Sequence, residues 1–325
     1  MKLAIFGAGM IVKDFFTMID DIPEIELAAI MGTPKDLNTM QELQSAHKIE
    51  KIYTDATECL ADPEIDTVYV ALPNFLHYKF TKMALEAGKN VICEKPFTLH
   101  ADQLEELSAL AQEKNLILVE AITNQYLTNY QDLKADLPKL GDLKVIECNY
   151  SQYSHRYDAF LAGKILPVFD PKKGGGALMD LNIYNIHFVV GLMGAPKAVH
   201  YYANVQRGVD TSGVLVLEYP ETKVICIAAK DCSASVRSTV QGNKGSIVVN
   251  GPTNVLSDYD EQLNDGDSEH VDNKVHAHRM FEEFQAFRKM IDNHDMDAAE
   301  KHMEHSVAVM KVVDAALLDA GIKLG

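Results

Sequence analysis

No apolar run in this chain approaches the roughly 18 to 20 residues that a transmembrane helix needs. The opening MKLAIFGAG holds an apolar stretch that is too short for a secretory signal, so we expect a cytoplasmic protein that does not enter a membrane. Closely spaced cysteine pairs are also absent, because the 5 cysteines are scattered without a Cys-x-x-Cys motif. We expect reduced, buried thiols and predict neither a disulfide nor a metal site.

Basic residues are scarce relative to acidic ones, with 30 Lys+Arg against 47 Asp+Glu and a formal net charge of -17. This charge repels polyanions, so binding to nucleic acid or to anionic lipid is not expected, although a local basic pocket could still hold one nucleotide. The 47% of hydrophobic and 24% of charged residues are typical of a globular protein. A chain of 325 residues exceeds what one core usually serves, which predicts two domains.

Short β-branched runs alternate with amphipathic stretches in the first part of the chain, which is typical of parallel strands joined by crossover helices. The predicted strands are 3–6, 27–30, 67–72, 90–93 and 116–119. Helices are predicted over 76–87 and 101–114, the second with Thr98 as its N-cap. The pattern predicts an N-terminal Rossmann dinucleotide-binding domain over 1–122.

Strand-like runs follow one another closely after residue 122, with turn chemistry at 219–222 and 242–245. These strands are predicted at 143–153, 198–205, 214–219, 224–230, 236–241 and 246–250, with helices at 281–291 and 307–318. The acidic segment 263–273 lacks core residues and is predicted to be an exposed loop. The fold class is therefore α/β, with a C-terminal α/β domain over 123–325 built on a large, mostly antiparallel open sheet.

Polar segments follow four of the predicted parallel strands directly. They are Gly7-Ala8-Gly9, Pro73-Asn74, Glu94-Lys95-Pro96 and the run from Glu120 to Gln125. The carboxyl ends of parallel strands meet at one edge of a sheet, where open α/β sheets bind ligands. Lys95 is therefore a candidate for chemistry as well as for solubility.

The two glycines Gly7 and Gly9 lie between a strand and an apolar helix, so backbone amides there can approach a pyrophosphate. Val12 departs from the small residue usual at the third position of this fingerprint, and a plain tight turn is the alternative. No carboxylate directly ends the second strand to accept the ribose hydroxyls, which favours NADP over NAD. Thr33 and Lys35 could bind the 2′-phosphate, although a solvent-exposed lysine on a loop is the favoured interpretation of Lys35.

A second group of candidates follows the triple glycine 174–176. Asp180, Tyr184 and His187 lie on one face of the apolar helix predicted there, and polar groups are costly to bury without partners. Taken singly, Asp180 reads as a charge at a helix N-terminus and His187 as a core histidine. Taken with Lys95, they form a candidate active site.

The whole chain resembles the glucose-fructose oxidoreductase and inositol dehydrogenase (Gfo/Idh/MocA) family, and also its dimeric dihydrodiol dehydrogenase branch. The resemblance rests on the N-terminal glycine pair, the run 73–77, Glu94-Lys95-Pro96, Glu120-Ala121, and the run 174–180 with Tyr184. It implies a Rossmann domain that binds NAD(P), Lys95 as catalytic lysine, Asp180 and Tyr184 as its partner motif, and a cis Lys95–Pro96 bond. The position of Tyr184 is histidine in inositol dehydrogenase-like members, so tyrosine favours the sugar oxidoreductase and dihydrodiol branches.

The expected function is hydride transfer between a nicotinamide and a hydroxyl or carbonyl carbon of a sugar, cyclitol or diol. Lys95 and Tyr184 would handle the proton, with Lys95 alone as base being the alternative, and Asp180 would orient Lys95 or a substrate hydroxyl. The expected cofactor contacts are Gly7, Gly9, Met10, Ile11, Thr33, Leu72, Pro73, Asn74, His77, Glu94 and Lys95. The expected substrate contacts are Asn124, Tyr126, Arg156 and His187, and Arg156 either meets an acidic group or pairs with Asp158 at the surface.

A non-catalytic NAD(P)-binding sensor of the same fold is the main competing interpretation, and a scaffold with a vestigial pocket is another. Both are disfavoured because Lys95, Asp180 and Tyr184 are all present. An open sheet face must be covered, so we expect a homodimer or homotetramer.

Overall fold

A computed structural model describes all 325 residues, whose internal contacts divide the chain into two units. Unit 1 comprises Met1–Ala121 and Met280–Glu304, and unit 2 comprises Ile122–Arg279 and His305–Gly325. The predicted second domain, 123–325, was therefore wrong in one respect, because residues 280–304 pack with the first unit.

The returning segment joins unit 1 through helix α9 (Phe281–Asp292). The ring of Phe284 lies 4.7 Å from that of Phe15 and 5.1 Å from that of Tyr69, measured between centroids. Phe284 and Phe287 are both fully buried. Removal of this aromatic surface from water stabilises the docking of a segment that is remote in sequence.

Unit 1 is built on six parallel strands. They are β1 (Lys2–Phe6), β2 (Glu26–Met31), β3 (Lys51–Tyr53), β4 (Thr67–Val70), β5 (Asn90–Glu94) and β6 (Leu118–Ala121), in the order β3-β2-β1-β4-β5-β6. This is the Rossmann order, and it confirms the predicted fold. The order reverses between β1 and β4, so the loops after these strands flank the crevice where such sheets bind ligands.

Five helices connect these strands. They are α1 (Met10–Phe16), α2 (Leu37–His47), α3 (Ala56–Leu60), α4 (His77–Glu86) and α5 (Ala101–Glu113). Helix α5 begins after His100, and no side chain caps it. The predicted N-cap at Thr98 was wrong because its hydroxyl donates instead to the carbonyl of His100 at 2.8 Å.

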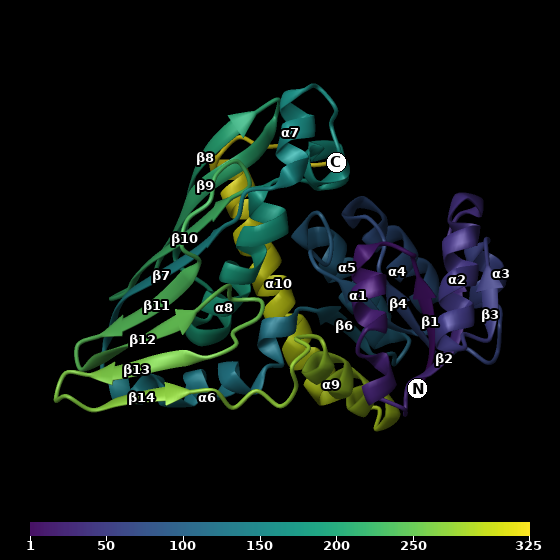
Figure 1. The fold of residues 1–325 in the computed structure, drawn as a ribbon, viewed down its shortest axis with the longest axis horizontal. Helices are drawn as coiled ribbons and strands as arrows, with labels where there is room; N and C mark the ends of the chain where they lie inside the picture. Colours follow the sequence, from purple (N-terminus) through teal and green to yellow (C-terminus); the bar gives the residue numbers. More distant parts are fainter. The chain divides into compact units, whose positions relative to one another are not determined.

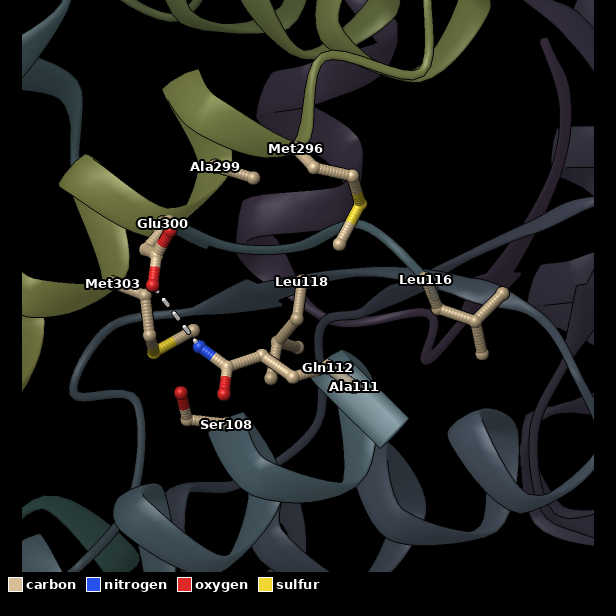
Figure 2. A pocket seen from close by; sticks show the side chains of 9 residues that line it. All are labelled: Ser108, Ala111, Gln112, Leu116, Leu118, Met296, Ala299, Glu300 and Met303. Carbon is tan, nitrogen blue, oxygen red and sulfur yellow. Dashed lines mark hydrogen bonds between the residues drawn. The ribbon is translucent and has the colours of Figure 1, made fainter. Parts of the chain in front are cut away.

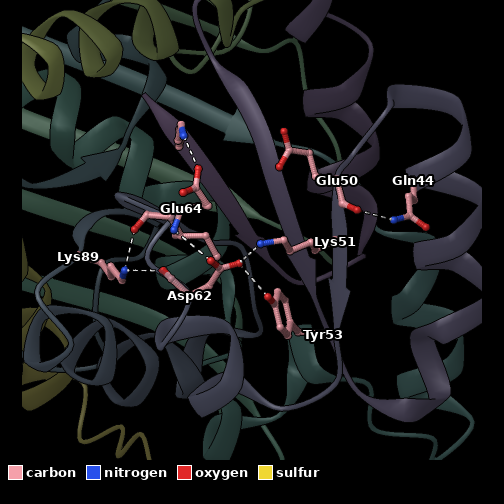
Figure 3. A network of polar contacts seen from close by, with 9 residues as sticks. Gln44, Glu50, Lys51, Tyr53, Asp62, Glu64 and Lys89 are labelled. Atoms are coloured by element: carbon pink, nitrogen blue, oxygen red, sulfur yellow. Dashed lines mark hydrogen bonds and ion pairs between the residues drawn. The ribbon is translucent and has the colours of Figure 1, made fainter.

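The edge of this sheet is held by a polar network around Asp62 (Figure 3). The Asp62 carboxylate accepts from Lys51 Nζ at 2.7 Å, from the Tyr53 hydroxyl at 2.8 Å and from the Glu64 amide at 3.0 Å. The ammonium of Lys89 donates to the carbonyl of Asp62 at 2.9 Å. The hydrogen bond from Lys51, followed by those from Glu64 and Tyr53, lowers the pKa of Asp62 to about 2.

We expect Asp62→Asn to lower the free energy of unfolding by about 1–3 kcal/mol, because the amide cannot accept from all three donors. The ordinary pKa of Asp62 is 3.8, so its ionised form stabilises the fold fully above that pH, and the effect is lost as pH falls towards 2. Urea unfolding should therefore separate wild type and variant at pH 7 and bring them together as the pH falls to about 2. Glu64→Gln is the control, since an exposed ion pair such as Lys2–Glu64 contributes only about 0–1 kcal/mol.

Helix α10 (Met296–Asp319) starts in unit 1 and continues into unit 2. Figure 2 shows its first turns, Met296, Ala299, Glu300 and Met303, facing α5 and the start of β6. The two helices are joined by a bond from Gln112 Nε2 to Glu300 Oε1 at 3.4 Å. Between them remains a mainly apolar cavity of about 60 Å³.

Unit 2 is built on an eight-stranded sheet in the order β14-β13-β12-β11-β7-β10-β9-β8. The strands are β7 (Leu143–Ser151), β8 (Ala198–Gln206), β9 (Val209–Glu218), β10 (Lys223–Ala229), β11 (Arg237–Gly242), β12 (Gly245–Asn250), β13 (Tyr259–Leu263) and β14 (Ser268–Val271). Every neighbouring pair is antiparallel except β7 and β10. This confirms the mostly antiparallel sheet.

The segment 263–273 was wrongly predicted to be a loop. Its residues 268–271 form the edge strand β14, paired with β13. Only Val271 of this strand is buried, so the alternation that marks a half-buried strand is missing from the sequence.

The helices of unit 2 lie along one face of its sheet, as Figure 1 shows for α8 (Ile183–Met193) and the C-terminal part of α10. Two further helices, α6 (Thr128–Asp136) and α7 (His155–Leu161), flank the first strand of the unit in sequence. A π-helical turn, Leu178–Asn182, precedes α8. None of the helices in the chain combines the length and the apolar character that crossing a bilayer requires.

Candidate active site

The turn after β1 is tightly fitted. The Gly7 amide donates to the carbonyl of Met31 at 2.8 Å, and the φ of Gly7 is 124°, which L side chains rarely adopt. A Cβ at Gly7 would collide with the carbonyl oxygen of Ala71, whereas a Cβ at Gly9 would meet open space. This turn therefore offers bare backbone beside the crevice between β1 and β4, as a diphosphate requires.

The start of α1 follows this turn. Gly9 is its N-cap and supplies no side-chain cap, Met10 is exposed and Ile11 is half-buried. Val12, which departs from the usual small residue, is fully buried. The helix α1 thus begins at a glycine, which has no side chain to stand between its first turn and a ligand.

The loop after β2 is held by its own residues. The Thr33 hydroxyl donates to Asp36 Oδ2 at 2.6 Å, and the Thr33 amide donates to the same oxygen at 2.9 Å. These bonds form a capping box at the start of a short helical turn, Pro34–Asp36. The hydroxyl that we expected to meet a 2′-phosphate is therefore already donating to Asp36, while Lys35 is exposed.

Lys95 follows β5, whose last residue, Glu94, is buried and accepts from the Tyr69 hydroxyl at 2.6 Å. Lys95 itself is half-buried, and its peptide bond to Pro96 is cis, as the resemblance implied. The next amide, that of Phe97, donates to the buried carboxylate of Glu120 at 3.2 Å. The backbone on both sides of Lys95 is thus held by contacts to neighbouring strands.

His77 joins the loop after β4 to the loop after β5. Its Nδ1 lies 2.9 Å from the carbonyl oxygen of Pro96, and its Nε2 lies 2.7 Å from that of Leu72. The ring is fully buried, and burial lowers the pKa of His77. His77 thus holds the backbone of Leu72 and Pro96, while Pro73 and Asn74 lie at the more exposed start of the same turn.

The parallel pair β7 and β10 brings a second set of side chains together. The two strands end side by side, with the Gln152 amide donating to Ala229 O at 2.9 Å and the Ser154 amide donating to Lys230 O at 2.9 Å. The residues after β7 therefore lie beside Lys230, which follows β10.

A pocket of about 350 Å³ opens at this place, entirely within unit 2. It is lined by Gln152, Tyr153, Ser154, His155, Arg156, Asp180, Leu181 and Lys230. The structure thus brings the predicted residues Asp180 and Arg156 to one pocket. The carboxylate of Asp158 accepts from the Tyr153 hydroxyl at 2.6 Å.

Lys230 is a site residue that sequence reasoning missed. Its Nζ lies 2.7 Å from Asp180 Oδ2 and 2.9 Å from the carbonyl oxygen of Val168, and it stands 4.7 Å above the ring of Phe169. The sequence placed Lys230 at the end of a strand, and that strand end was the only available signal.

The turn of Gly176 is fixed by Asp210 of β9. The φ of Gly176 is 128°, and a Cβ there would collide with Asp210 Oδ1. Asp210 Oδ2 accepts from the Leu178 amide at 2.6 Å and from the Tyr201 hydroxyl at 2.7 Å. Burial raises the pKa of Asp210 to about 6. A glycine is thus needed at position 176, because a Cβ there would displace the Asp210 carboxylate. That carboxylate holds the start of the turn that carries Asp180.

Tyr184 lies on α8, which Asn124 and Gln125 hold in place. The amide of Asn124 donates to Tyr184 O at 2.9 Å, and that of Gln125 donates to His187 O at 3.0 Å. The ring of Tyr184 is largely buried, 6.2 Å from that of Tyr150.

Three expected substrate contacts, Asn124, Tyr126 and His187, lie outside the lining of this pocket. Asn124 is fully buried and holds the backbone of α8. His187 is also fully buried, and its Nδ1 lies 2.9 Å from His305 Nε2 on α10. Neither lines the pocket of unit 2, and Tyr126, which is half-buried after the turn Thr123–Gln125, does not line it either.

Fold and site define a nucleotide-binding oxidoreductase with a Rossmann unit and a second α/β unit. Residues 1–122 match the oxidoreductase family with an NAD-binding Rossmann fold, and residues 136–248 match the C-terminal domain of the same Gfo/Idh/MocA proteins. The chain belongs to the Gfo/Idh/MocA oxidoreductase family.

Two relatives illustrate the range of this similarity. The scyllo-inositol 2-dehydrogenase (NADP(+)) IolU of Bacillus subtilis is 31% identical over 327 residues, covering 99% of this chain and 98% of IolU. The trans-1,2-dihydrobenzene-1,2-diol dehydrogenase of Xenopus tropicalis is 28% identical over 254 residues, covering 76% of this chain and 74% of that protein. Both are named dehydrogenases, which agrees with the predicted enzyme class.

Among solved structures, the 3-ketoreductase KijD10 from Actinomadura kijaniata, in complex with NADP and TDP-benzene, has the same fold. It superimposes with a TM-score of 0.82 at 19% sequence identity, covering 98% of this chain and 97% of KijD10. At this identity the likeness concerns the fold alone.

Proposed function

We propose that this protein is an NADP(H)-preferring dehydrogenase or reductase that acts on the CH–OH carbon of a sugar, cyclitol or diol. The observation that carries the proposal is that the chain has both Lys95, which follows β5 in unit 1, and an intact Asp180 and Tyr184 motif in unit 2. The names of the relatives, a scyllo-inositol dehydrogenase and dihydrodiol dehydrogenases, support the substrate class.

The residues of unit 1 fit a dinucleotide. The bare Gly7 turn and the glycine N-cap of α1 suit a diphosphate, and Leu72, Pro73 and Asn74 follow β4 at the same edge of the sheet. When bound, the nicotinamide supplies the hydride acceptor or donor. NADP is favoured because the carboxylate that follows β2, that of Asp36, is already accepting two bonds from Thr33 while Lys35 is exposed.

Lys95 and Tyr184 manage the proton of the substrate hydroxyl in this proposal. The Lys95 ammonium donates to the substrate oxygen and stabilises negative charge as it develops there. Tyr184 accepts the proton in oxidation and returns it in reduction. Asp180 orients the substrate hydroxyl, and Arg156, His155 and Gln152 offer polar contacts to a polyhydroxylated ligand in the same pocket.

The test is turnover of a panel of sugars, cyclitols and diols with NADP and with NAD, read as absorbance of the reduced cofactor. We expect at least one polyol to be oxidised, with kcat/KM higher for NADP than for NAD. A change in NADPH fluorescence would show that the cofactor binds. If it occurs without turnover of any panel member, the result favours a non-catalytic NAD(P)-binding sensor instead. If the protein does not bind NADPH, the remaining interpretation is a structural scaffold with a vestigial pocket.

We also propose that the open face of the unit 2 sheet joins two copies of this chain. Tyr202, Val214, Val216, Ile225 and Ile227 share this face through the register of β8, β9 and β10, and Tyr202 is 69% exposed. Such a contiguous apolar area is typical of a subunit interface.

We expect Ile225→Asp to shift the protein from a dimer or larger assembly towards the monomer in sedimentation velocity. A carboxylate buried at the centre of this interface would lose its hydration without gaining a partner. Val275→Asp, at an exposed valine outside the sheet, should leave the assembly intact. A monomeric wild type at micromolar concentration would contradict the proposal.

A further inference from the structure

Lys230 is a buried ammonium that the proposed chemistry leaves without a role. Its side chain is only 3% exposed, although it lines the pocket of unit 2. A charge this deeply buried costs free energy unless it is paired and hydrogen-bonded. Its partner is the predicted catalytic carboxylate of Asp180, whose Oδ2 lies 2.7 Å from Lys230 Nζ, so the burial of Lys230 is linked to the candidate site.

Three contacts of the Lys230 ammonium reach one segment, which comprises the glycine-rich turn and the start of its helix. It donates to Val168 O at 2.9 Å and to Asp180 Oδ2 at 2.7 Å, and it stands over Phe169. A single ammonium thus ties the end of β10 to both ends of the segment 168–180. Of these contacts, only the one to Asp180 involves a side chain with a role in the proposed chemistry.

Asp180 is fixed from two sides. Asp210 holds the Leu178 amide two residues before it, and Lys230 holds its carboxylate directly. The surrounding turn is π-helical, and turns of this kind are frequent at functional sites. Rotation of the Asp180 side chain would break its charge-assisted bond to Lys230, and a bond of this kind is about twice as strong as a neutral one.

We propose that Lys230 is a positioning residue that acts through Asp180, keeping its carboxylate ionised and aimed at the substrate in the pocket. This inference rests on the proposed function, since it assigns Lys230 to the same reaction. The residue does not transfer the proton itself. It determines which way the Asp180 oxygens face and how readily they take up a proton from solvent.

The test compares Lys230→Met with Lys230→Arg on the best substrate of the panel. We expect Lys230→Met to lower kcat about 10- to 100-fold, as small misplacements of catalytic groups do. The acid limb of its pH profile should move to higher pH, because the carboxylate has lost its cation. Lys230→Arg, which keeps the charge, should recover much of kcat, and Lys244→Met, at an exposed hairpin lysine, should match wild type.

A double-mutant cycle decides whether Lys230 acts through Asp180. In the Asp180→Asn background, adding Lys230→Met should cost less than about threefold in kcat, since coupled residues are non-additive. The double variant also removes both charges of the pair and leaves no unpaired buried charge. It can therefore still fold where a single variant does not. Thermal unfolding of every variant separates loss of fold from loss of rate.

Three outcomes would overturn this inference: additive losses in the cycle, an unshifted pH profile, or a kcat for Lys230→Met equal to that of wild type in a folded protein. A further result would assign Lys230 to the fold alone. In it, Lys230→Met and Lys230→Arg both lower the thermal stability, while the folded fraction of each variant keeps a normal kcat. If the wild type turns over no member of the panel, the proposed function fails instead. If Lys95→Met abolishes turnover and Lys230→Met does not, only the inference about Lys230 fails.

Discussion

Lys95→Met should lower kcat/KM at least about a thousandfold, the largest effect expected from any single substitution in this chain. The change removes the ammonium while keeping a side chain of similar length. Loss of one preorganised donor to a developing oxyanion costs about a hundred- to a thousandfold, and loss of proton transfer costs a similar factor. The two losses multiply if Lys95 both donates to the developing oxyanion and supports proton transfer.

The fold around position 95 should survive this substitution. The neighbouring backbone is held by Glu120, which accepts from the Phe97 amide, and by His77, which contacts the Pro96 carbonyl. NADPH binding, followed by fluorescence, should therefore change less than about threefold, because backbone amides supply much of the phosphate contact. Lys114→Met, at an exposed lysine that ends α5, is the matched control and should behave as wild type. Near-normal turnover in Lys95→Met with intact cofactor binding would show that Lys95 is not catalytic.

The Rossmann unit could be predicted because its signals are local. Each buried strand reads as an apolar run, and each polar segment follows a strand directly, so Gly7, Asn74 and Lys95 could be assigned to one sheet edge from sequence alone. β3 was missed because its residues Lys51–Tyr53 are only half-buried and too few to show a period.

The return of α9 to unit 1 could not be predicted for a different reason. Its amphipathic pattern predicted a helix at 281–291 correctly, but such a pattern does not identify the surface that the apolar face covers. That surface is formed by Phe15 and Tyr69, which lie far away in the sequence. Domain membership is a property of tertiary contacts, and no boundary signal stands near residue 280 in the sequence.

The same distinction separates the site residues that could be predicted from those that could not. Asp180 and Tyr184 stand in a motif with helical spacing, so they could be nominated from the sequence. Lys230 and Asp210 hold that motif from β10 and β9, and their importance arises only when the sheet brings them together. His77 and Asn124 were nominated by position, but their contacts to backbone carbonyls make them supports of the site.

Tyr184→Phe should lower kcat about a hundredfold with a smaller change in KM, and it should remove one limb of the pH profile. The substitution deletes only the hydroxyl, and the ring stays packed near Tyr150 on a helix that Asn124 and Gln125 hold. A positioned acid or base contributes about a hundred- to ten-thousandfold, so this loss is the one expected if the phenol carries the proton. Steady-state rates of oxidation and reduction across pH, with the best substrate of the panel, measure it.

Tyr130→Phe, on helix α6, provides the matched control. The Tyr130 hydroxyl donates to Phe188 O of α8 at 2.8 Å, so its removal should cost about 1 kcal/mol of stability while kcat stays within about threefold of wild type. If Tyr184→Phe instead keeps the pH limb and most of kcat, proton transfer belongs to Lys95, and the phenol only orients the substrate. The pair of tyrosine variants therefore separates a hydroxyl that moves a proton from one that only holds the helix, and with Lys95→Met it identifies the base.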